Sequence, residues 1–493
     1  MTKHESLPTD VRALLPEPGA TLLIEGTWRA AASTFDVVDP ATLGVIAEVA
    51  DANADNAREA LASTLAAYDG WRREPAEARA TRLHAGVLGL RDNAEALARL
   101  MSIENGKPLH EARGEILRGA AMLEWGIEEG RRAYGRVVPS SASGRGLVIS
   151  APVGPALAVT PWNFPASMLL RKIGLSLSVG SPMLAKPAEQ TPLIAVAVIR
   201  ILNEQLPPGV LNLLTTARPA EVVDVILEDP GLRKITFTGS TEVGLALARK
   251  AGPVLRRVSL EMGGHSPAIV FPDADLEATA DAIMSAKFPN AGQSCLAINR
   301  LFVHESVADA LLPLLVERVG RLRLGRGLDD GVTTGPLIDF GGLEKVERHV
   351  RDAVEKGAEI VVGGERWQSE DPALQGAFFE PTILTGLNES MQIAHEETFG
   401  PVLPIYTYGD DEDVIARANA TNYGLAAYVF GSDFNRLWDA MERLEFGVVG
   451  VNDPMPNRPE LPHGGLKNSG QGREGGTEGI EDYVEAKAVA IKR

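Results

Sequence analysis

The chain has 493 residues, of which 45% are hydrophobic and 23% are charged, and its formal net charge is −18 at neutral pH. This composition is typical of a globular protein with enough apolar residues for more than one core, and it excludes an extensively disordered chain. The acidic balance, with no basic stripe, argues against a nucleic-acid surface, and no long uninterrupted apolar run predicts a membrane span.

The first part of the chain has helical periodicity and little that resembles catalytic chemistry. Residues 53–132 are rich in alanine with apolar residues at helical spacing, which predicts packed helices. Residues 136–155 hold two apolar stretches around a turn at 139–144, and residues 485–492 alternate as a strand does. The start of the chain lacks a positive region followed by an apolar run, so we expect a cytoplasmic protein.

The middle of the chain alternates short apolar runs with helical segments, which predicts a parallel sheet with helices on its faces. Thr191 and Pro192 suit the N-cap and first position of a helix that ends before residue 207. A second α/β region follows over residues 266–450, with helices near 308–322 and 342–356. The expected strands of the first region are residues 156–159, 182–185, 210–214, 234–237 and 257–260.

Cys295 is the only cysteine in the sequence. A lone cysteine is more often a small buried hydrophobe than a nucleophile, so its presence alone decides nothing. A single thiol has no disulfide partner within the chain, and the neighbours Gln293 and Ser294 are unusual for an ordinary buried thiol. This context favours a nucleophile.

Three further candidates lie beside predicted strands. Glu261 ends an apolar strand just before two glycines, where a partly buried carboxylate with a raised pKa would suit a general base or would merely cap a turn. Gly239 and Ser240 open a helix after a strand, so their N–H groups would face a pyrophosphate, or the glycine would only permit a tight turn. Asn163, between two prolines, suits an amide donor or a turn.

Six short motifs in a fixed order resemble those of the aldehyde dehydrogenase superfamily, closest to its NAD(P)-dependent succinate-semialdehyde dehydrogenase branch. The resemblance covers nearly the whole chain, and the ordered combination is far more specific than any single motif. The motifs are Pro-Trp-Asn-Phe-Pro at 161–165, Lys-Pro-Ala-Glu at 186–189, Phe-Thr-Gly-Ser-Thr at 237–241, Leu-Glu-Met-Gly-Gly at 260–264, Asn-Ala-Gly-Gln-Ser-Cys at 290–295 and Glu-Thr-Phe-Gly-Pro at 397–401.

The resemblance implies an α/β fold with a Rossmann-type cofactor domain, an α/β catalytic domain and a small β-hairpin oligomerisation arm. It also implies a homodimer or homotetramer. The expected division is an NAD-binding domain (residues 1–133 and 156–265), a catalytic domain (266–450), oligomerisation strands (134–155 and 478–493) and a substrate-tunnel loop that returns to the cofactor domain (451–477).

The family's chemistry assigns roles to three residues. Cys295 would attack the aldehyde to give a thiohemiacetal and, after oxidation, a thioester. The side-chain amide of Asn163 and the Cys295 N–H would stabilise the oxyanion. Glu261 would activate the water that releases the acid, and its presence favours hydrolysis over transfer to coenzyme A.

The resemblance also implies a set of nicotinamide-dinucleotide contacts and no metal. Lys186 and Glu189 match a pair that binds the adenosine ribose, and because the Glu189 carboxylate would repel a 2′-phosphate, we expect NAD in preference to NADP. Glu397 would hold the nicotinamide ribose. The expected cofactor contacts are Pro161, Trp162, Asn163, Lys186, Pro187, Ala188, Glu189, Gly239, Ser240, Val243, Met262, Glu397 and Phe399.

The substrate expected by resemblance is a short semialdehyde such as succinate semialdehyde. Arg171 matches an arginine that binds the far carboxylate, but the branch's second arginine is replaced by Pro289, so we expect Arg458 to substitute for it. Lys172 and Glu474 match a pair proposed to relay the proton from Glu261. A neutral, aromatic or amino-aldehyde substrate is the nearest alternative, and a non-catalytic binding protein of the same fold is a more distant one.

Overall fold

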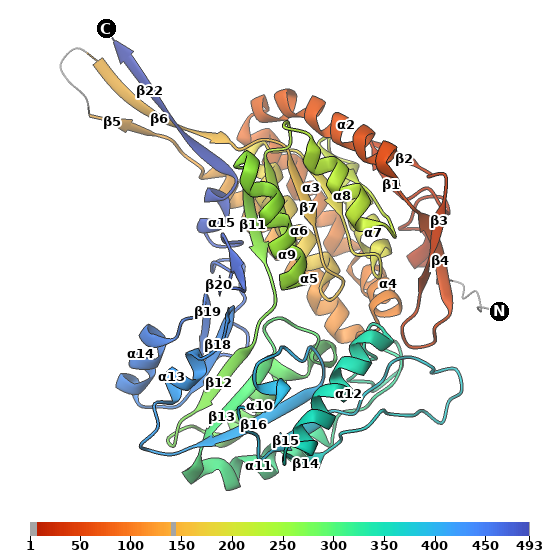
Figure 1. Ribbon diagram of the computed structural model, residues 1–493. Coiled ribbons are helices and arrows are strands. Elements are labelled where there is room, and N and C mark those ends of the chain that lie inside the picture. Colours follow the sequence, from red (N-terminus) through yellow and green to blue (C-terminus); the bar gives the residue numbers. More distant parts are fainter. Residues whose placement is uncertain (1–6, 140–143, 493) are drawn as a thin grey trace.

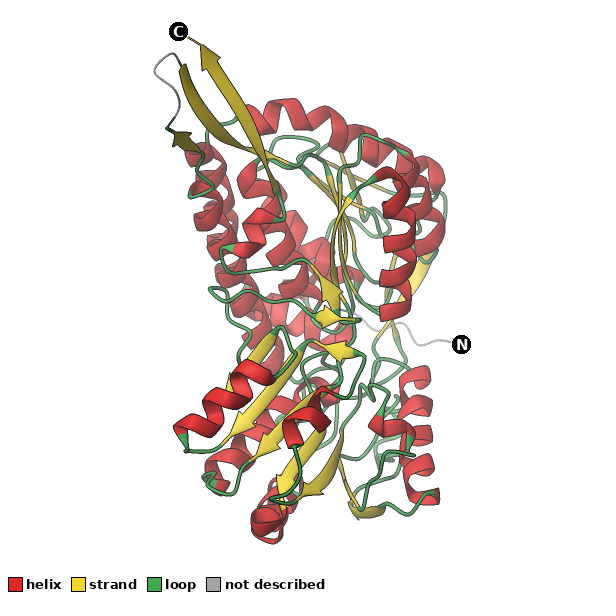
Figure 2. Ribbon diagram, turned by 60° about the vertical axis from the view of Figure 1, so that its left-hand side comes forward, coloured by secondary structure: helices red, strands yellow, loops and turns green. Residues whose placement is uncertain are grey.

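The structure is a computed structural model that describes residues 7–139 and 144–492. Two large sheets of eight and seven strands form the two halves of the molecule, and a three-stranded arm projects from the first half (Figure 1). Helices cover both faces of each large sheet (Figure 2). This arrangement is the α/β architecture expected from the sequence.

The first sheet has the strand order β2-β1-β9-β8-β7-β10-β11-β21. Its five central strands run parallel, and all five were predicted from the alternation of apolar runs and helices. The strands are β1 (Leu22–Ile24), β2 (Thr27–Arg29), β7 (Ala156–Val159), β8 (Met183–Lys186), β9 (Leu211–Leu213), β10 (Lys234–Thr238), β11 (Arg257–Glu261) and β21 (Gly470–Gln471).

Both faces of this sheet are buried, because alternate strand residues enter different cores. Ala158 packs with helices α3 to α7, whereas its neighbours Leu157 and Val159 pack with α2, α8 and α9 on the other face. The helices are α1 (Thr9–Arg12), α2 (Ala54–Arg73), α3 (Ala76–Asp92), α4 (Ala94–Asn105), α5 (Leu109–Arg131), α6 (Pro165–Val179), α7 (Pro192–Asn203), α8 (Pro219–Glu228) and α9 (Thr241–Ala251), followed by the 3₁₀ turn η1 (Gly252–Val254).

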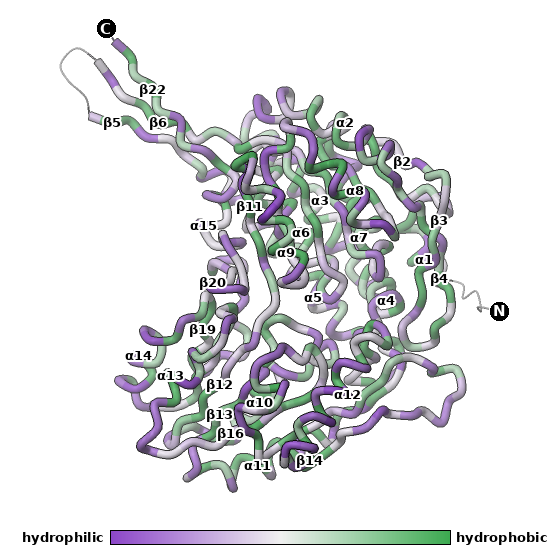
Figure 3. The backbone as a smooth tube through the Cα atoms, in the orientation of Figure 1, coloured by the Kyte–Doolittle hydropathy of each residue, from purple (hydrophilic) through white to green (hydrophobic). Residues whose placement is uncertain are grey.

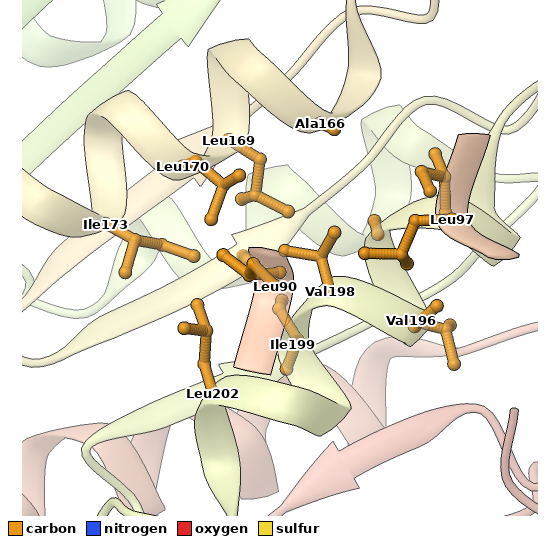
Figure 4. Packing of buried hydrophobic residues seen from close by; sticks show 14 of the residues in the cluster. Leu90, Leu97, Ala166, Leu169, Leu170, Ile173, Val196, Val198, Ile199 and Leu202 are labelled. Atoms are coloured by element: carbon orange, nitrogen blue, oxygen red, sulfur yellow. The ribbon is translucent and has the colours of Figure 1, made fainter. Parts of the chain in front are cut away.

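The core between helices consists of aliphatic side chains without polar atoms. Apolar segments gather inside both halves and hydrophilic ones on the outer helices (Figure 3). A close view shows side chains of α6 pointing toward those of α7 around Leu90: Leu169, Leu170, Ile173, Val198, Ile199 and Leu202 (Figure 4).

Two of the helices that begin with proline are capped by buried glutamates from other helices: α7 by Glu104 and α6 by Glu115. At the start of α7, the backbone N–H groups of Leu193 and Ile194 donate to Glu104 of α4 at 2.6 and 3.0 Å. Thr191 occupies the N-cap position as predicted, but its side chain makes no capping hydrogen bond. The expected cap is therefore wrong in its chemistry, because a distant carboxylate satisfies the N–H groups instead.

The second sheet has the strand order β14-β15-β16-β13-β12-β18-β19, and all its pairs are parallel except β14 with β15. Its strands are β12 (Ser266–Val270), β13 (Ile298–His304), β14 (Glu359–Val362), β15 (Thr382–Thr385), β16 (Val402–Tyr408), β18 (Ala426–Phe430) and β19 (Val448–Val451). Its helices are α10 (Leu276–Lys287), α11 (Glu305–Val319), α12 (Phe340–Glu355), α13 (Val414–Asn419) and α14 (Phe434–Arg443), with 3₁₀ turns η2 (Pro289–Gly292) and η3 (Gln392–Ala394).

A short connection joins the two sheets at the centre of the molecule. Glu261 is the last residue of β11, and Ser266 is the first of β12. The carboxyl ends of the first sheet's parallel strands therefore face the amino ends of β12, β13 and β16. Loops at such strand ends are where α/β proteins bind ligands.

The arm consists of β5 (Arg136–Val138), β6 (Gly144–Pro152) and β22 (Val484–Lys492), paired antiparallel in the order β22-β6-β5. The predicted strands on both sides of the hairpin are present, whereas residues 140–143 of the predicted turn lie outside the described residues, as does residue 493. Smaller elements complete the chain: β3 (Thr34–Val38) with β4 (Val45–Ala50), β17 (Tyr423–Gly424) with β20 (Leu466–Lys467), and α15 (Glu478–Glu481).

Across the described residues, none of the helices combines the length and the apolar character that crossing a bilayer requires.

Candidate active site

A cavity of about 770 Å³ lies between the two sheets. Its walls come from the loops after β7, β10 and β11 of the first sheet and from the segments before β13 and β16 of the second. Helices α5, α6, α10 and α12, residues 454–457, Tyr428 and His463 line the rest. The cavity therefore brings together residues that are far apart in the sequence, nine of them predicted site residues: Pro161, Trp162, Asn163, Gly239, Ser240, Met262, Cys295, Glu397 and Phe399.

The loop that carries Cys295 has an unusual backbone. Asn290 and Ala291 both have positive φ, at 53° and 54°, a region that residues other than glycine rarely occupy. The loop is held by the Asn290 N–H, which donates to Glu111 at 2.7 Å, and by the Asn290 side chain, which donates to the Asn163 carbonyl at 3.0 Å. A Cβ on Gly264 would lie 2.4 Å from the Cys295 carbonyl oxygen, so only glycine allows this approach.

Cys295 is partly exposed to the cavity. Burial in the protein, reinforced by the carboxylates of Glu397 and Glu261, raises the pKa of its thiol to about 12. The sulfur is therefore protonated at neutral pH in the structure as it stands. A nucleophile at this position needs a base close to it.

Glu261, the base predicted from the sequence, lies close enough for its charge to act on Cys295. Its side chain is buried, and burial together with the charge of Glu474 raises its pKa well above the ordinary value, although Lys172 and Arg171 act in the opposite direction. It is not among the lining residues, but His463 is, and the Nε2 atom of His463 lies 3.5 Å from a Glu261 oxygen. Burial lowers the pKa of His463 well below its ordinary value, so this ring is neutral.

Lys172 and Glu474 form a fully buried ion pair behind Glu261. The hydroxyl of Thr236 donates to Glu474 at 3.0 Å, while the second Glu474 oxygen has no hydrogen-bond partner. Burial favours the neutral form of Glu474, but Lys172 and Arg171 outweigh it and lower its pKa. The predicted relay pair thus adjoins the predicted base, and its role stays a prediction.

Asn163 lies in the cavity wall with its amide group close to the Cys295 loop. The amide nitrogen donates to the Gln293 carbonyl at 3.1 Å, which leaves its second N–H for a ligand. The backbone carbonyl of Asn163 accepts a hydrogen bond of 2.8 Å from Lys107, which is also paired with Glu115 at 2.5 Å. Glu115 in turn accepts the Ala166 and Ser167 N–H groups at the start of α6.

The opposite end of the cavity fits a nicotinamide dinucleotide. Gly239 and Ser240 lie at the N-terminus of α9, where backbone N–H groups favour an anion. The buried hydroxyl of Thr238 beside them has no partner. The Glu397 carboxylate accepts the Gly264 N–H at 3.0 Å, and burial raises its pKa to about 7.

The aromatic residues of two predicted motifs touch at this end of the cavity. Phe399 packs edge-on against Trp162 with ring centroids 5.6 Å apart, and its backbone has a positive φ of 56°. This contact joins the loop after β7 to the segment before β16.

The remaining predicted cofactor residues lie outside the cavity lining. Lys186 ends β8, and its ammonium group is 3.3 Å from the carboxylate of Glu189, which is 39% exposed. Pro187 and Ala188 lie between them, and Val243 is exposed on the first turn of α9. Their position at the carboxyl ends of neighbouring parallel strands is where the far half of a dinucleotide would extend.

The two arginines predicted for the substrate do not line the cavity. Arg171 is buried, and one of its nitrogens donates to Asn457 at 2.6 Å, while its Nε and Nη1 atoms have no partner. Arg458 is paired with Asp453 at 2.6 Å. The structure therefore gives no support to Arg458 as a second anion-binding residue.

Four residues of the site escaped the sequence-based predictions. Lys107, Glu111 and Arg118 come from the helical region that showed no catalytic pattern, and His463 is one histidine among eight scattered ones. The only sequence feature that marks Lys107 and Glu111 is their position on either side of the start of a helix. Charged residues are common at such positions on protein surfaces, so this feature does not indicate a functional site. Their place in the site becomes visible only when α5 packs on α6.

Comparison with known proteins gives a consistent result. The model of the aldehyde dehydrogenase family matches residues 28–489. The chain is 43% identical over 473 residues to succinate-semialdehyde dehydrogenase [NADP(+)] GabD of Escherichia coli, covering 95% of this chain and 97% of that protein. It is 41% identical over 472 residues to 3-sulfolactaldehyde dehydrogenase of Pseudomonas putida, covering 95% and 96%.

A solved structure agrees. The crystal structure of an E. coli NADP dependent enzyme superposes with a TM-score of 0.94 at 42% identity, covering 98% of this chain and 99% of that one.

The expected preference for NAD over NADP is wrong. The E. coli relative carries NADP(+) in its name, and the superposed E. coli structure is described as NADP dependent. The physical reason lies in the charge of Glu189: Lys186 stands 3.3 Å from its carboxylate and offsets the repulsion of a 2′-phosphate.

Proposed function

Because this chain belongs to the aldehyde dehydrogenase family, we propose that it oxidises a short aldehyde with a terminal anionic group to the free carboxylic acid by way of a thioester on Cys295. The observation that carries this proposal is the position of the only thiol in the chain. It lies in the cavity between the two sheets, close enough to Glu261 and Glu397 for their charges to raise its pKa.

The first step forms a bond between sulfur and the aldehyde carbon. Glu261, whose raised pKa suits proton uptake near neutral pH, takes the thiol proton, directly or through a water molecule. The sulfur attacks the carbonyl carbon, and the carbonyl oxygen becomes an oxyanion. The free N–H of Asn163 and the backbone N–H of Cys295 would stabilise that oxyanion.

The second step is oxidation, followed by hydrolysis. A bound nicotinamide dinucleotide supplies the acceptor for the two electrons and the hydrogen that leave this carbon. The oxyanion collapses to a thioester on Cys295. Glu261 passes the thiol proton to solvent and then takes a proton from water as the water oxygen attacks the thioester carbon. The carbon–sulfur bond breaks to release the acid, and the sulfur leaves as a thiolate that recovers the proton from Glu261.

The cofactor proposed is a nicotinamide dinucleotide, NADP included. Gly239 and Ser240 would hold the pyrophosphate, Glu397 the ribose next to the nicotinamide, and Lys186 with Glu189 the other ribose. The first sheet with its helices would then bind the cofactor, and residues 266–450 would supply the nucleophile. Both cofactors are to be assayed separately, since the proposed site of this ribose holds a cation, Lys186, as well as the carboxylate of Glu189.

An anionic substrate is supported by Arg171 and by the names of the relatives. Two nitrogens of the buried Arg171 guanidinium have no partner, although the Asn457 side chain holds the third. Succinate semialdehyde carries a carboxylate, and 3-sulfolactaldehyde carries a sulfonate. A panel of succinate semialdehyde, glutarate semialdehyde, butanal, benzaldehyde and 4-aminobutanal tests the proposal, and a higher kcat/KM for the last three than for the semialdehydes contradicts it.

The mechanism is tested by Glu261→Gln. This variant keeps the shape of the side chain but cannot accept a proton, so we expect both the attack by Cys295 and the hydrolysis to slow, with steady turnover at least 100-fold slower than in the wild type. Reduced cofactor should still form up to about one equivalent per Cys295, but more slowly than in the wild type. Mass spectrometry of the stalled enzyme should find the acyl group on the peptide that contains Cys295. Steady turnover at the wild-type rate would refute the assignment of the base.

We also propose a homo-oligomer. Val137 of β5, Ile149 of β6 and Ile491 of β22 are 69%, 45% and 48% exposed, and the pairing of the three strands puts them on one face of the arm. A second exposed apolar group lies on α9 and η1, where Leu255 is 92% exposed. Apolar surfaces of this kind are typical of interfaces between copies.

A further inference from the structure

One face of α5 lines the cavity with residues one turn apart. Gly114, Arg118 and Met122 follow each other at intervals of four, so they lie on the same side of the helix, and all three are lining residues. His110 and Glu111 line the cavity on the preceding turn. The same cavity contains Cys295, so this helix face is part of the space that a substrate occupies.

The guanidinium of Arg118 lies over Gly114. A Cβ built on Gly114 would be 3.1 Å from the Nη1 atom of Arg118, closer than nearly all real contacts of a Cβ. This direction is the ordinary one, because helical side chains point back toward the N-terminus and over the residue four positions earlier. The missing side chain at Gly114 therefore provides the space in which the positive charge rests beside the cavity.

Arg118 is an exposed lining residue whose charge is not engaged in an ion pair, and among the lining cations of the described chain it shares this property only with Lys345, which lies toward Glu397. Within residues 7–139 and 144–492, no hydrogen bond or ion pair to its guanidinium is found, whereas Lys107 is held by Glu115 and by the Asn163 carbonyl. Arg458 is paired with Asp453, and Arg171, which donates to the neutral side chain of Asn457, lies behind the lining. Glu115, three residues before Arg118 on the same helix, is already held by Lys107 and by the N–H groups of Ala166 and Ser167, and Glu111 accepts the Asn290 N–H at 2.7 Å.

We propose that Arg118 is a specificity-determining residue that binds the terminal carboxylate or sulfonate of the aldehyde substrate, in the place that Gly114 keeps open. The proposal rests on the proposed function and names the residue that selects the substrate class. Its guanidinium offers paired N–H donors that match the geometry of a carboxylate or a sulfonate. The charge of Glu111 weakens this attraction only in part, because burial raises the pKa of its carboxyl group to about 7.

The test compares Arg118→Gln with the wild type on succinate semialdehyde and on butanal, which lacks the carboxylate. We expect the KM for succinate semialdehyde to rise roughly five- to tenfold with kcat changed less than about twofold, and the kcat/KM for butanal to stay within about twofold. Arg113→Gln is the matched control, because Arg113 lies on the same helix but is paired with Glu95 away from the cavity. It should leave both substrates unaffected.

Gly114→Ala provides a second variant that removes no charge. The added methyl group would displace the guanidinium, and alanine in place of glycine favours the helix, so folding should be preserved. We expect a selective rise in the KM for succinate semialdehyde that is smaller than in Arg118→Gln, because a Cβ at 3.1 Å shifts the flexible guanidinium without removing its charge. Added salt should raise this KM in the wild type and have less effect in Arg118→Gln.

The outcomes separate the two proposals. If the wild type oxidises succinate semialdehyde better than butanal but Arg118→Gln keeps the same ratio of kcat/KM values, the role of Arg118 is refuted and the proposed function stands. If the wild type shows no preference for the semialdehyde, the anionic substrate class fails and the role of Arg118 fails with it. A selective loss in Arg118→Gln and Gly114→Ala, with Arg113→Gln unchanged, supports the proposal.

Discussion

Cys295 and Glu261 both have raised pKa values because both are held away from water. A protonated thiol and a carboxylate that binds protons readily make a pair in which one group can supply the proton that the other takes. The rate should increase with pH, since a group with a raised pKa becomes a competent base only as the pH rises through that pKa. The electrostatics of a few side chains therefore set the working pH.

His463 is expected to tune this pH dependence. Its Nε2 atom lies 3.5 Å from the Glu261 carboxylate and its ring is neutral, so an N–H directed at the carboxylate would stabilise the charged form and hold the pKa of Glu261 down. His463→Phe removes that donor. We expect the rising limb of the pH profile of kcat to move up by about 0.5 to 1 pH unit.

His463→Gln is the control for this prediction, because its amide N–H can still donate to the carboxylate. It should keep the wild-type limb more closely than His463→Phe does. If both variants lower kcat equally at every pH, His463 supports the packing of the site and has no influence on Glu261.

Site residues could be predicted from the sequence where the proposed chemistry requires a particular residue type. They could not be predicted where only the packing of the folded chain brings a residue to the site. Cys295 was found because it is the only thiol, and Asn163 because its motif matched a family. Lys107 was not found because its role depends on contacts with Glu115 and with the Asn163 carbonyl, which no local pattern announces. Arg458 was misplaced for the same reason, since its pairing with Asp453 is a feature of the folded loop.

At the scale of elements, buried carboxylates connect neighbouring helices. Glu104 of α4 accepts two N–H groups at the start of α7, and Glu115 of α5 does the same for α6 while it binds Lys107. The helix that begins immediately after Asn163 is thereby fixed to α5. The position of Asn163, the proposed oxyanion donor, depends on this contact as well as on its own loop.

Glu104→Ala should destabilise the protein strongly. It leaves the N–H groups of Leu193 and Ile194 buried without an acceptor, at a cost of about 1–3 kcal/mol each. Thermal unfolding followed by circular dichroism should show a clearly lower midpoint. Glu95→Ala on the exposed face of the same helix is the control, and an equal shift in the two variants would contradict the capping role.

The effect of pH on stability follows from the same residue. Burial raises the pKa of Glu104 to about 8, above its value in the unfolded chain, so the folded state binds the proton more tightly. Its contribution to stability is fully present below about pH 4.5 and is lost as the pH rises toward 8. In Glu104→Gln this pH dependence should be absent, and denaturant unfolding between pH 5 and 8.5 measures the difference from the wild type.

The strands of the first sheet could be predicted because each is a short apolar run buried on both faces, as in Ala156–Val159. The caps could not, because the donors and acceptors are far apart in the chain. Thr191 is a residue type that often caps helices, yet Glu104 of another helix accepts the hydrogen bonds at the start of α7. Whether a segment forms a strand or a helix can therefore be predicted from its local sequence. The residue that accepts hydrogen bonds from the N–H groups at the start of α7 cannot, because it comes from another helix.

On the scale of the whole molecule, we expect the arm to form an interface between copies of the chain. Its exposed apolar face contains Val137, Ile149 and Ile491, which no part of the described chain covers. We expect the double substitution Ile149→Lys and Ile491→Lys to shift the protein to a smaller assembly in light scattering coupled to gel filtration. A double substitution of the exposed Arg136 and Lys492 to alanine, on the other face of the arm, is the control.

An unchanged assembly in the lysine variant would show that the arm is not part of the interface. In that case the exposed apolar residues of α9 and η1 become the next surface to test, with Leu255 as the first position.

The connection between β11 and β12 has a practical consequence for engineering. A break in the chain between residues 263 and 264 would put Asn163, Ser240 and Glu261 on one fragment, and Cys295 and Glu397 on the other. Neither fragment would hold a complete set of reacting groups, so enzyme activity would return only on reassembly. The molecule therefore has a natural division for a split reporter, in which restored turnover signals that two fused partners have met.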